Sequence, residues 1–327
     1  MRALPHPLCA HQLEHPVDII AIVMTSGRSA VELALFVLLP IMVVMLAVMR
    51  LLEAAGIMDW LVARLAPLLR PFGLTGLSVF ALLQVNFVSF AAPLATLTTM
   101  ERRGTSDRHL AATLGMVLAM GQANVVFPLT ALGLNLGRFV GLSIVGGLVA
   151  ALATYYLWGR HLSTAERLLD EHLDHPTMND PKGVLAVINH AGSEAFRIAI
   201  GAIPMVALSL VLVNTVRGIG GFDWLEAVLS PALNLAHIDP RVIMPTVTKC
   251  LAGGTAVLGL LVDLNRSGHI DAHFINASAG WLVHTLDLPG VAILMSAGPR
   301  VARVWKPAVA GAAIGILVRT LAHVALA

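Results

Sequence analysis

The chain contains two copies of one sequence unit, offset by 164 residues. The aligned positions include Gly56 with Gly220, Trp60 with Trp224, Pro67 with Pro231, Pro40 with Pro204, and the motif Arg-x-Gly-x-x-Asp-x-His at 102–109 with its second copy at 266–273. A period this long is not that of a stacked solenoid, whose repeats are about 20–50 residues long. Duplicated hydrophobic halves are instead typical of membrane transporters, in which the substrate site lies between the two repeats.

The composition indicates an integral membrane protein. Hydrophobic residues make up 57% of the chain and charged residues 12%, with a mean hydropathy of +0.82, which leaves too little polar surface for a soluble protein. A helix needs roughly 20 apolar residues to cross a hydrocarbon core. About eight stretches meet this need, four in each repeat: 32–53, 74–100, 109–134, 138–158, 195–217, 241–264, 273–297 and 307–326.

We therefore predict an all-α, polytopic transmembrane helical bundle built from two homologous repeats, in which some of the hydrophobic segments are re-entrant or broken. The predicted parts are a polar N-terminal tail at 1–16, a first repeat at 17–158, a polar linker at 159–180 and a second repeat at 181–327. Lys and Arg are divided almost equally between the two sides of such a bundle, so the charge bias gives no orientation. Parallel and inverted repeats both stay open.

Two kinds of amphipathic helix are expected in the plane of the membrane. Short apolar stretches at 19–23 and 184–188 precede the first span of each repeat and have the pattern of interfacial helices. After that span, apolar residues at helical spacing surround Trp60 in one repeat and Trp224 in the other. Tryptophan is enriched at the level of the lipid headgroups, so these two helices are predicted to be anchored there.

Several function classes find no support in the sequence. A formal charge of +2 gives no basic stripe for nucleic acid, and the chain has no Gly-x-x-x-x-Gly-Lys-Ser/Thr phosphate loop, so energy coupling is expected to come from ions or a partner. The chain has two cysteines, Cys9 in the predicted tail and Cys250 inside a predicted span, and this placement does not suggest a disulfide framework. No enzymatic activity is predicted, because no nucleophile, paired carboxylates or metal-spaced ligands converge at one depth apart from the group around Lys249. No cofactor or metal site is predicted either.

The repeated Arg-x-Gly-x-x-Asp-x-His motif has a structural explanation. Arginine at the end of a helix meets the negative end of the helix dipole, and glycine supplies a left-handed cap. Asp107 and Asp271 are then predicted to cap the next span of each repeat.

Polar residues inside the spans are the candidate binding residues, because each is costly in hydrocarbon unless it faces a cavity or a partner. The predicted substrate-binding set is Gln84, Asn86, Ser89, Gln122 and Asn124 from the first repeat, with Thr248, Lys249, Cys250, His284 and Asp287 from the second. Glycines at 253–254 and prolines such as Pro93 lie beside these positions and are expected to loosen the helices there.

Lys249 and Asp287 are predicted to form an ion pair. At about 1.5 Å per residue, Lys249 lies roughly 12 Å into its span and Asp287 roughly 15 Å from the matching end of the following antiparallel span, so their depths agree. A buried lysine without a carboxylate would lose its proton, which favours the pairing. The alternative is that Lys249 snorkels to the interface while Asp287 caps a broken helix.

The spacing of these features resembles a known family. The span around Pro40, the glycine- and tryptophan-containing helix from Gly56 to Pro67, and the polar, interrupted span that follows are similar to the Gate, or nucleoside recognition, domain. That domain occurs in concentrative nucleoside transporters, in the membrane part of the ferrous-iron transporter and in spore maturation proteins. The resemblance covers about 17–327 as two Gate-like copies and implies discontinuous helices around a central site. The Cys-x-x-Pro element of the iron transporter is absent, since the corresponding stretches are 86–89 and 250–253.

The resemblance implies a secondary transporter in the bacterial cytoplasmic (inner) membrane, crossing it several times. Its solute would be small and polar, with nucleosides among the candidates, held between the repeats and coupled to a proton or sodium. The expected partners are the lipid bilayer, the solute, the coupling ion and further copies of the chain in a homo-oligomer. The alternatives are a non-transporting membrane scaffold or assembly factor of the spore-maturation type, and a metal-ion permease.

Overall fold

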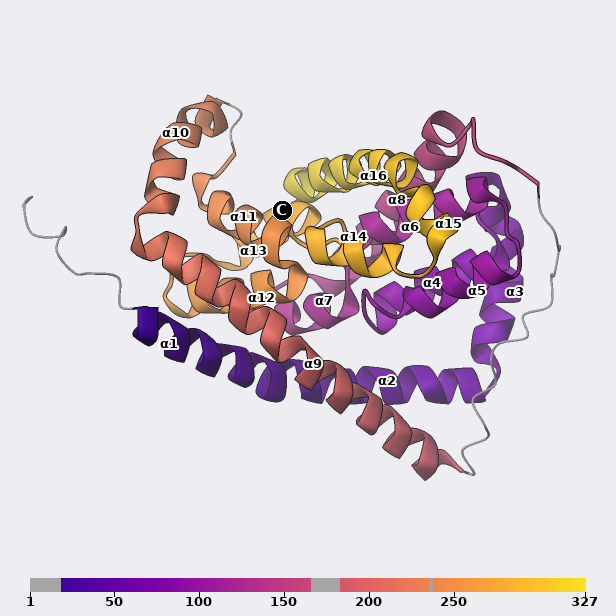
Figure 1. The fold of residues 1–327 in the computed structure, drawn as a ribbon, viewed down its shortest axis with the longest axis horizontal. Coiled ribbons are helices and arrows are strands. Elements are labelled where there is room, and N and C mark those ends of the chain that lie inside the picture. Colours follow the sequence, from indigo (N-terminus) through magenta and orange to yellow (C-terminus); the bar gives the residue numbers. More distant parts are fainter. Residues whose placement is uncertain (1–18, 166–182, 236–237) are drawn as a thin grey trace, which may run out of the picture.

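The structure, a computed structural model, describes residues 19–165, 183–235 and 238–327, and all the regular elements in these ranges are helices (Figure 1). The predicted tail at 1–16 and most of the predicted linker at 159–180 lie outside the described residues. The all-helical fold class predicted from the sequence is confirmed.

The first repeat runs from one long helix to another. Its elements are α1 (Ile19–Glu32), the π-helical turn η1 (Leu33–Leu38), α2 (Leu39–Ala54), α3 (Ile57–Leu69), the short η2 (Arg70–Phe72), α4 (Gly76–Phe87), α5 (Pro93–Arg102), α6 (Asp107–Ala119), α7 (Ala123–Thr130), α8 (Leu136–Leu152) and a second π-helical turn, η3 (Ala153–Trp158).

The second repeat has the same order. It consists of α9 (Val184–Gly218), α10 (Gly221–Leu235), the short η4 (Pro240–Val242), α11 (Ile243–Ala252), α12 (Gly254–Arg266), α13 (Ala272–Leu282), α14 (Leu288–Met295), α15 (Pro299–Arg303) and α16 (Trp305–Leu326). Helix α3 corresponds to α10, and Trp60 and Trp224 on them are 65% and 67% exposed. The turns also correspond, because Gly104 and Gly268 both adopt φ 73°.

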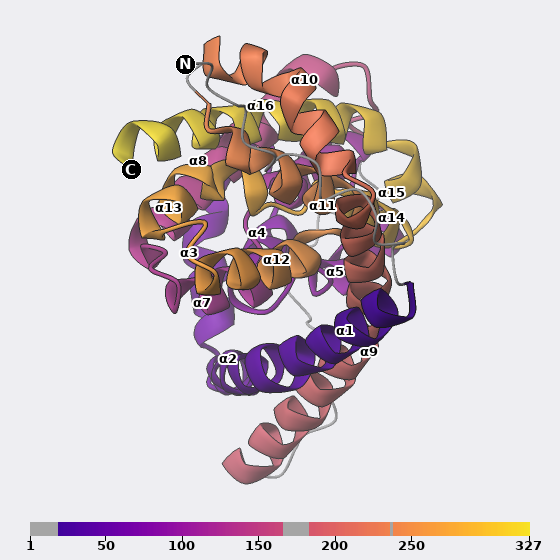
Figure 2. The same ribbon diagram turned by 90° about the vertical axis from the view of Figure 1, so that its left-hand side faces the viewer.

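The two repeats are inverted relative to each other. The helix α1–η1–α2 and the helix α9 cross along one side of the molecule and run in opposite directions (Figures 1 and 2). Helices α3 and α10, which follow them, consequently lie at opposite ends of the molecule in Figure 1. Of the two arrangements that the charge distribution left open, the structure has the inverted one.

The short stretches at 19–23 and 184–188 are not separate interfacial helices, so this prediction was wrong. Each forms the first turns of a long helix, Ile19–Ala54 in one repeat and Val184–Gly218 in the other. Pro40 is tolerated inside the first of these because the wider turn of η1 ends just before it and relieves the contact that proline makes with the preceding turn.

Five helical stretches in the described ranges are long and apolar enough to cross a membrane: Ile19–Ala54, Asp107–Thr130, Leu136–Trp158, Val184–Gly218 and Trp305–Leu326. The protein is thus a multi-pass membrane protein. The stretch Asp107–Thr130 is itself broken at 120–122, between α6 and α7, and the other predicted spans are interrupted too. Helix α4 ends before a break at 88–92, α11 ends at Gly253, and α13 is separated from α14 by 283–287. These breaks confirm that some hydrophobic segments are not continuous spans.

The aspartate of the repeated motif caps a helix in the second repeat but pairs with an arginine in the first. Asp271 caps α13 by accepting a hydrogen bond from the Phe274 N–H at 2.8 Å, as predicted. The cap of α6 is instead Ser106, whose Oγ accepts from the His109 N–H at 3.3 Å. Asp107 is therefore free to accept two hydrogen bonds from the Arg300 guanidinium, at 2.9 and 2.6 Å, which join α6 to α15.

The core of the bundle lies around α6, whose residues from Leu110 to Ala119 are all buried. Helices α8 and α16 pack on α6, and they approach each other closely because glycines line the contact between them. A Cβ built on Gly315 would lie 2.2 Å from the carbonyl oxygen of Gly146, and one built on Gly311 would lie 1.9 Å from Oγ1 of Thr154. Small residues four apart let two membrane helices approach in this way.

We expect Gly315→Leu to destabilise the protein by about 1–3 kcal/mol, because the added side chain must push α16 away from α8. Thermal unfolding of the purified protein in detergent measures the effect. Gly141→Leu is the matched control, since a Cβ at Gly141 on α8 meets nothing within 4 Å. Equal unfolding temperatures for the two variants would show that the close contact does not hold the bundle together.

Candidate functional site

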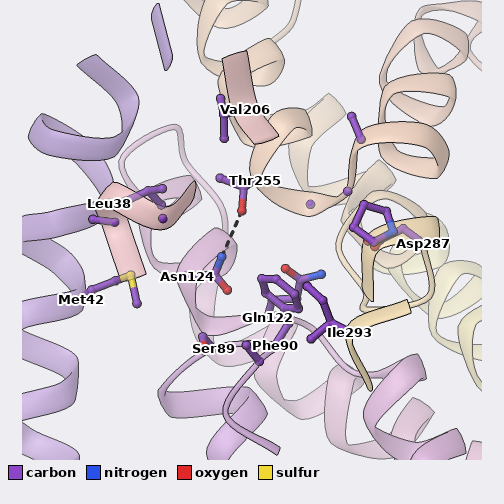
Figure 3. Close-up of a pocket in the computed structure, with 17 residues that line it drawn as sticks. Leu38, Met42, Ser89, Phe90, Gln122, Asn124, Val206, Thr255, Asp287 and Ile293 are labelled. Atoms are coloured by element: carbon purple, nitrogen blue, oxygen red, sulfur yellow. Dashed lines mark hydrogen bonds between the residues drawn. The ribbon is translucent and has the colours of Figure 1, made fainter. Parts of the chain in front are cut away.

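The helix breaks of both repeats meet at one cavity of about 210 Å³. Its wall includes Ser89, Phe90, Ala91, Gln122 and Asn124 from the first repeat and Gly253, Gly254, Thr255, Asp287, Pro289 and Ile293 from the second. Leu38 and Met42 of the first long helix and Val206 of α9 also line it (Figure 3). Ser89, from the segment 86–89, and Gly253, from the segment 250–253, therefore both line the same cavity.

The break after α6 and the break after α13 are hydrogen-bonded to each other. The Thr285 N–H donates to the Leu118 carbonyl oxygen at 3.1 Å, and the Thr285 hydroxyl donates to the Met120 carbonyl oxygen at 3.3 Å. Gln122 Nε2 donates to the His284 carbonyl oxygen at 3.0 Å. Each break leaves backbone groups that a continuous helix would have paired, and here the opposite repeat pairs them.

Two further side chains complete the break after α6. Ser143 Oγ of α8 accepts from the Gly121 N–H at 2.8 Å, and Arg319 Nη1 of α16 donates to the Ala119 carbonyl oxygen at 2.8 Å. Arg319 is fully buried, and its guanidinium lies 4.8 Å from the centre of the Phe139 ring. A cation at the C-terminal end of a helix is stabilised by the carbonyl dipoles. Arg319 was missed in the sequence, although a charged residue in the middle of the 307–326 span was a usable signal.

Gln122 and Asn124 bring two amide groups to the cavity wall. Asn124 Nδ2 lies 3.3 Å from Thr255 Oγ1, which links α7 to α12 across the repeats (Figure 3). Because Gln122 Nε2 is used by His284, Gln122 Oε1 is the atom left over. Neither Gln122 Oε1 nor Asn124 Oδ1 has a hydrogen-bond partner among the described residues. Thr255, which the sequence did not single out, is the one partner of these amides from α12.

Gly254 makes room for the Gln122 amide. A Cβ at Gly254 would lie 2.9 Å from Oε1 and 3.0 Å from Nε2 of Gln122. Gly253, just before it, has φ 83°, a left-handed conformation that favours glycine. The glycine pair thus both ends α11 and lets α12 approach the amide.

Lys249 and Asp287 form the predicted ion pair. Lys249 Nζ donates to Asp287 Oδ2, and the two residues are 1% and 7% exposed. Asp287 Oδ1 accepts from the Gly290 N–H at 2.7 Å, so the same carboxylate caps the N-terminus of α14. Asp287 lines the cavity, and Lys249 lies behind it on α11. The pairing and the helix cap, considered as alternatives from the sequence, are both present.

The other predicted site residues have their own partners and are not among the residues of the cavity wall. Gln84 Oε1 accepts from Thr96 at 2.7 Å, Asn86 Nδ2 donates to the Leu82 carbonyl oxygen at 2.8 Å, Thr248 donates to the Met244 carbonyl oxygen at 2.9 Å, and His284 Nδ1 accepts from the Leu286 N–H at 3.1 Å. Cys250 is exposed. Of the predicted set, the structure gathers Ser89, Gln122, Asn124 and Asp287 around the cavity, with Lys249 bound to the last.

In the part of the chain that the structure describes, no group of three or more His, Cys, Asp or Glu residues could hold a metal ion.

Known proteins resemble the chain in sequence over part of its length and in fold over nearly all of it. Residues 35–168 match the family model of the Gate domain, described as nucleoside recognition. No curated protein sequence is significantly similar. The structure of CNTnw in an inward-facing, substrate-bound state matches with a TM-score of 0.66 at 18% identity, over 93% of this chain and 82% of that one.

Other states of the same protein match equally well. A doubly substituted CNTnw in an outward-facing state gives a TM-score of 0.67 at 18% identity, covering 94% of this chain and 85% of that one. A variant in an intermediate state gives 0.64 at 19% identity, covering 94% and 84%. Residues 35–168 thus match the Gate, or nucleoside recognition, domain in sequence, and the fold of the chain is similar to that of CNTnw.

Proposed function

We propose that the protein is a secondary transporter of a small polar solute of the nucleoside type, which binds in the cavity between the two repeats. The observation that carries the proposal is the pair of unpartnered, buried amide oxygens, Gln122 Oε1 and Asn124 Oδ1, which belong to two residues that line this cavity. Leaving such an acceptor buried without a donor costs about 1–3 kcal/mol, and a solute with N–H or O–H groups would remove that cost.

The size and charge of the cavity narrow the solute class. A volume of about 210 Å³ is below the roughly 300–1,000 Å³ of pockets for drug-sized ligands, which favours a small molecule. The wall is mostly apolar, and the charges of Lys249 and Asp287 cancel, so an uncharged solute with an apolar face and a few polar groups fits best.

The inverted repeats supply a route for transport. In such proteins one repeat rocks against the other around a site at their interface, which opens to each side in turn. CNTnw, which has the same fold, has been seen inward-facing, outward-facing and in intermediate states. We propose the same alternation here, in the bacterial cytoplasmic membrane, with a proton or sodium gradient as the driving force.

The test is solute binding and uptake by the purified protein. A thermal-shift screen of nucleosides, nucleobases and other small polar solutes identifies the ligand, and proteoliposomes with an imposed sodium or proton gradient then measure its uptake. We expect Gln122→Leu to weaken binding about ten-fold or more, because the solute loses its acceptor and the His284 carbonyl its donor. Asn189→Leu, which alters an exposed amide on α9, is the control.

Uptake by wild-type liposomes that exceeds empty liposomes, together with loss in Gln122→Leu but not Asn189→Leu, supports the proposal. If no solute in the screen binds or enters, the transport proposal fails and a scaffold role becomes the better explanation of the fold. Binding that Gln122→Leu leaves unchanged would place the solute elsewhere.

A further inference from the structure

The ion pair between Lys249 and Asp287 belongs to one repeat only. By the 164-residue offset, the positions equivalent to Lys249 and Asp287 are Val85 and Ala123. Both are buried and apolar, at 0% and 1% exposure. The breaks in the first repeat therefore form without an ion pair at these positions, where the one charged side chain described above is Arg319 at the end of α6. The fold itself does not require an ion pair at this place.

The buried carboxylate of Asp287 needs a cation beside it. It lines the cavity but is 7% exposed, and a carboxylate in a site that is poor in water is strongly disfavoured without a partner. One oxygen is satisfied by the Gly290 N–H, a neutral donor that leaves the charge uncompensated. The other oxygen accepts from the ammonium of Lys249.

Lys249 reaches the Asp287 carboxylate from the other helix break of the same repeat, the one that follows α11. Its carbonyl oxygen accepts from the Gly253 N–H at 3.0 Å, so the residue belongs to the last turn of α11. Gly253 itself approaches the carboxylate closely, because a Cβ there would lie 3.4 Å from Asp287 Oδ1. The end of one broken helix thus brings the ammonium to the start of another, beside the carboxylate that lines the cavity.

We infer that Lys249 is a tethered counter-cation, which takes at Asp287 the place that a free monovalent cation would otherwise have to fill. The cavity then keeps a neutral wall without binding sodium at Asp287. It follows, if the proposed transport function holds, that a coupling sodium ion binds at other residues.

The experiment compares cation-dependent stability in four proteins: wild type, Lys249→Ala, Lys249→Met and the double variant Lys249→Ala/Asp287→Asn. Thermal unfolding is measured in sodium, methylammonium and choline chloride at equal ionic strength. Alanine leaves room for a cation beside the carboxylate, whereas methionine fills that room without charge. Asparagine removes the charge that would attract the cation and still caps a helix well.

We expect the wild type to unfold at one temperature in all three salts. Lys249→Ala should unfold at a lower temperature in choline and gain about 5 °C, saturably, in sodium or methylammonium. Lys249→Met and the double variant should show no such gain. If Lys249→Ala cannot be purified in choline, its recovery in methylammonium but not in choline is the expected result.

Two outcomes overturn the inference. One is a saturable sodium stabilisation of the wild type that Asp287→Asn abolishes, which would mean that Asp287 binds sodium despite the lysine. The other is a Lys249→Ala protein that no small cation stabilises or recovers. Thermal unfolding does not depend on uptake. The result for Lys249 can therefore be interpreted even if the transport proposal fails.

Discussion

Replacing Lys249 by Met alone is expected to destabilise the protein by about 3–5 kcal/mol and to abolish solute uptake. The substitution keeps the volume of the side chain but leaves the carboxylate of Asp287 buried without a counter-charge. The double variant Lys249→Met/Asp287→Asn should recover most of the lost stability, since asparagine can still cap α14 through the Gly290 N–H. Uptake should stay impaired, because a neutral amide replaces the charged carboxylate at the cavity wall.

Unfolding in detergent and uptake in proteoliposomes check this result, and a double-mutant cycle separates the pair's interaction from the two single effects. Asp287→Asn alone should also be destabilised, because it strands the ammonium. A Lys249→Met protein with wild-type stability and uptake would contradict the prediction and would mean that the ammonium spends its time at the membrane surface.

Replacing Gly254 by Val is expected to lower solute binding and uptake at least ten-fold while the protein still folds. A Cβ at this position would come within 3.1 Å of three atoms of the Gln122 side chain, and the Gln122 amide is the group that has to move. Its movement breaks the bond to the His284 carbonyl oxygen and pushes the side chain into the cavity. We expect a stability loss of about 1–3 kcal/mol, as for other overpacked sites.

Gly201→Ala is the matched control, because Gly201 of α9 lines the same cavity but a Cβ there meets nothing within 4 Å. Binding and uptake of the identified solute are measured for both variants. If Gly254→Val binds the solute as well as Gly201→Ala does, Gln122 is not positioned by this glycine and the amide is not a solute ligand.

The repeat offset was enough to predict the paired helices around Trp60 and Trp224 and the existence of helix breaks. It did so because glycine, proline and helical periodicity act locally and recur in both copies. The depth argument for Lys249 and Asp287 also succeeded, since the rise of a helix per residue is nearly constant.

The surroundings of each position could not be predicted in the same way. Asn86 and Cys250 are equivalent by the offset, yet Asn86 is buried and Cys250 is exposed. Each copy packs against different neighbours. Two residues at equivalent positions of the repeats can therefore differ in how deeply they are buried. Arg319 was missed for the same reason. Its role depends on the hydrogen bond that it donates to the carbonyl oxygen of Ala119, 200 residues away in the sequence.

Continuity of the long helices was also beyond the sequence argument. The stretch at 19–23 has an interfacial pattern, but no proline or glycine pair separates it from the following span, and helix formation is cooperative once begun. Tertiary contact with α9 along its length then extends it as one element.

The length of the two crossed helices ties the cavity to the lipid around it. A helix of 36 residues is about 54 Å long, while a hydrocarbon core is about 30 Å thick, so this helix leans strongly or carries its ends out of the core. Its crossing partner α9 is 35 residues long and under the same constraint. Thinner bilayers favour a greater lean and thicker ones a smaller lean. Since Leu38, Met42 and Val206 belong to this pair, bilayer thickness acts directly on the wall of the cavity.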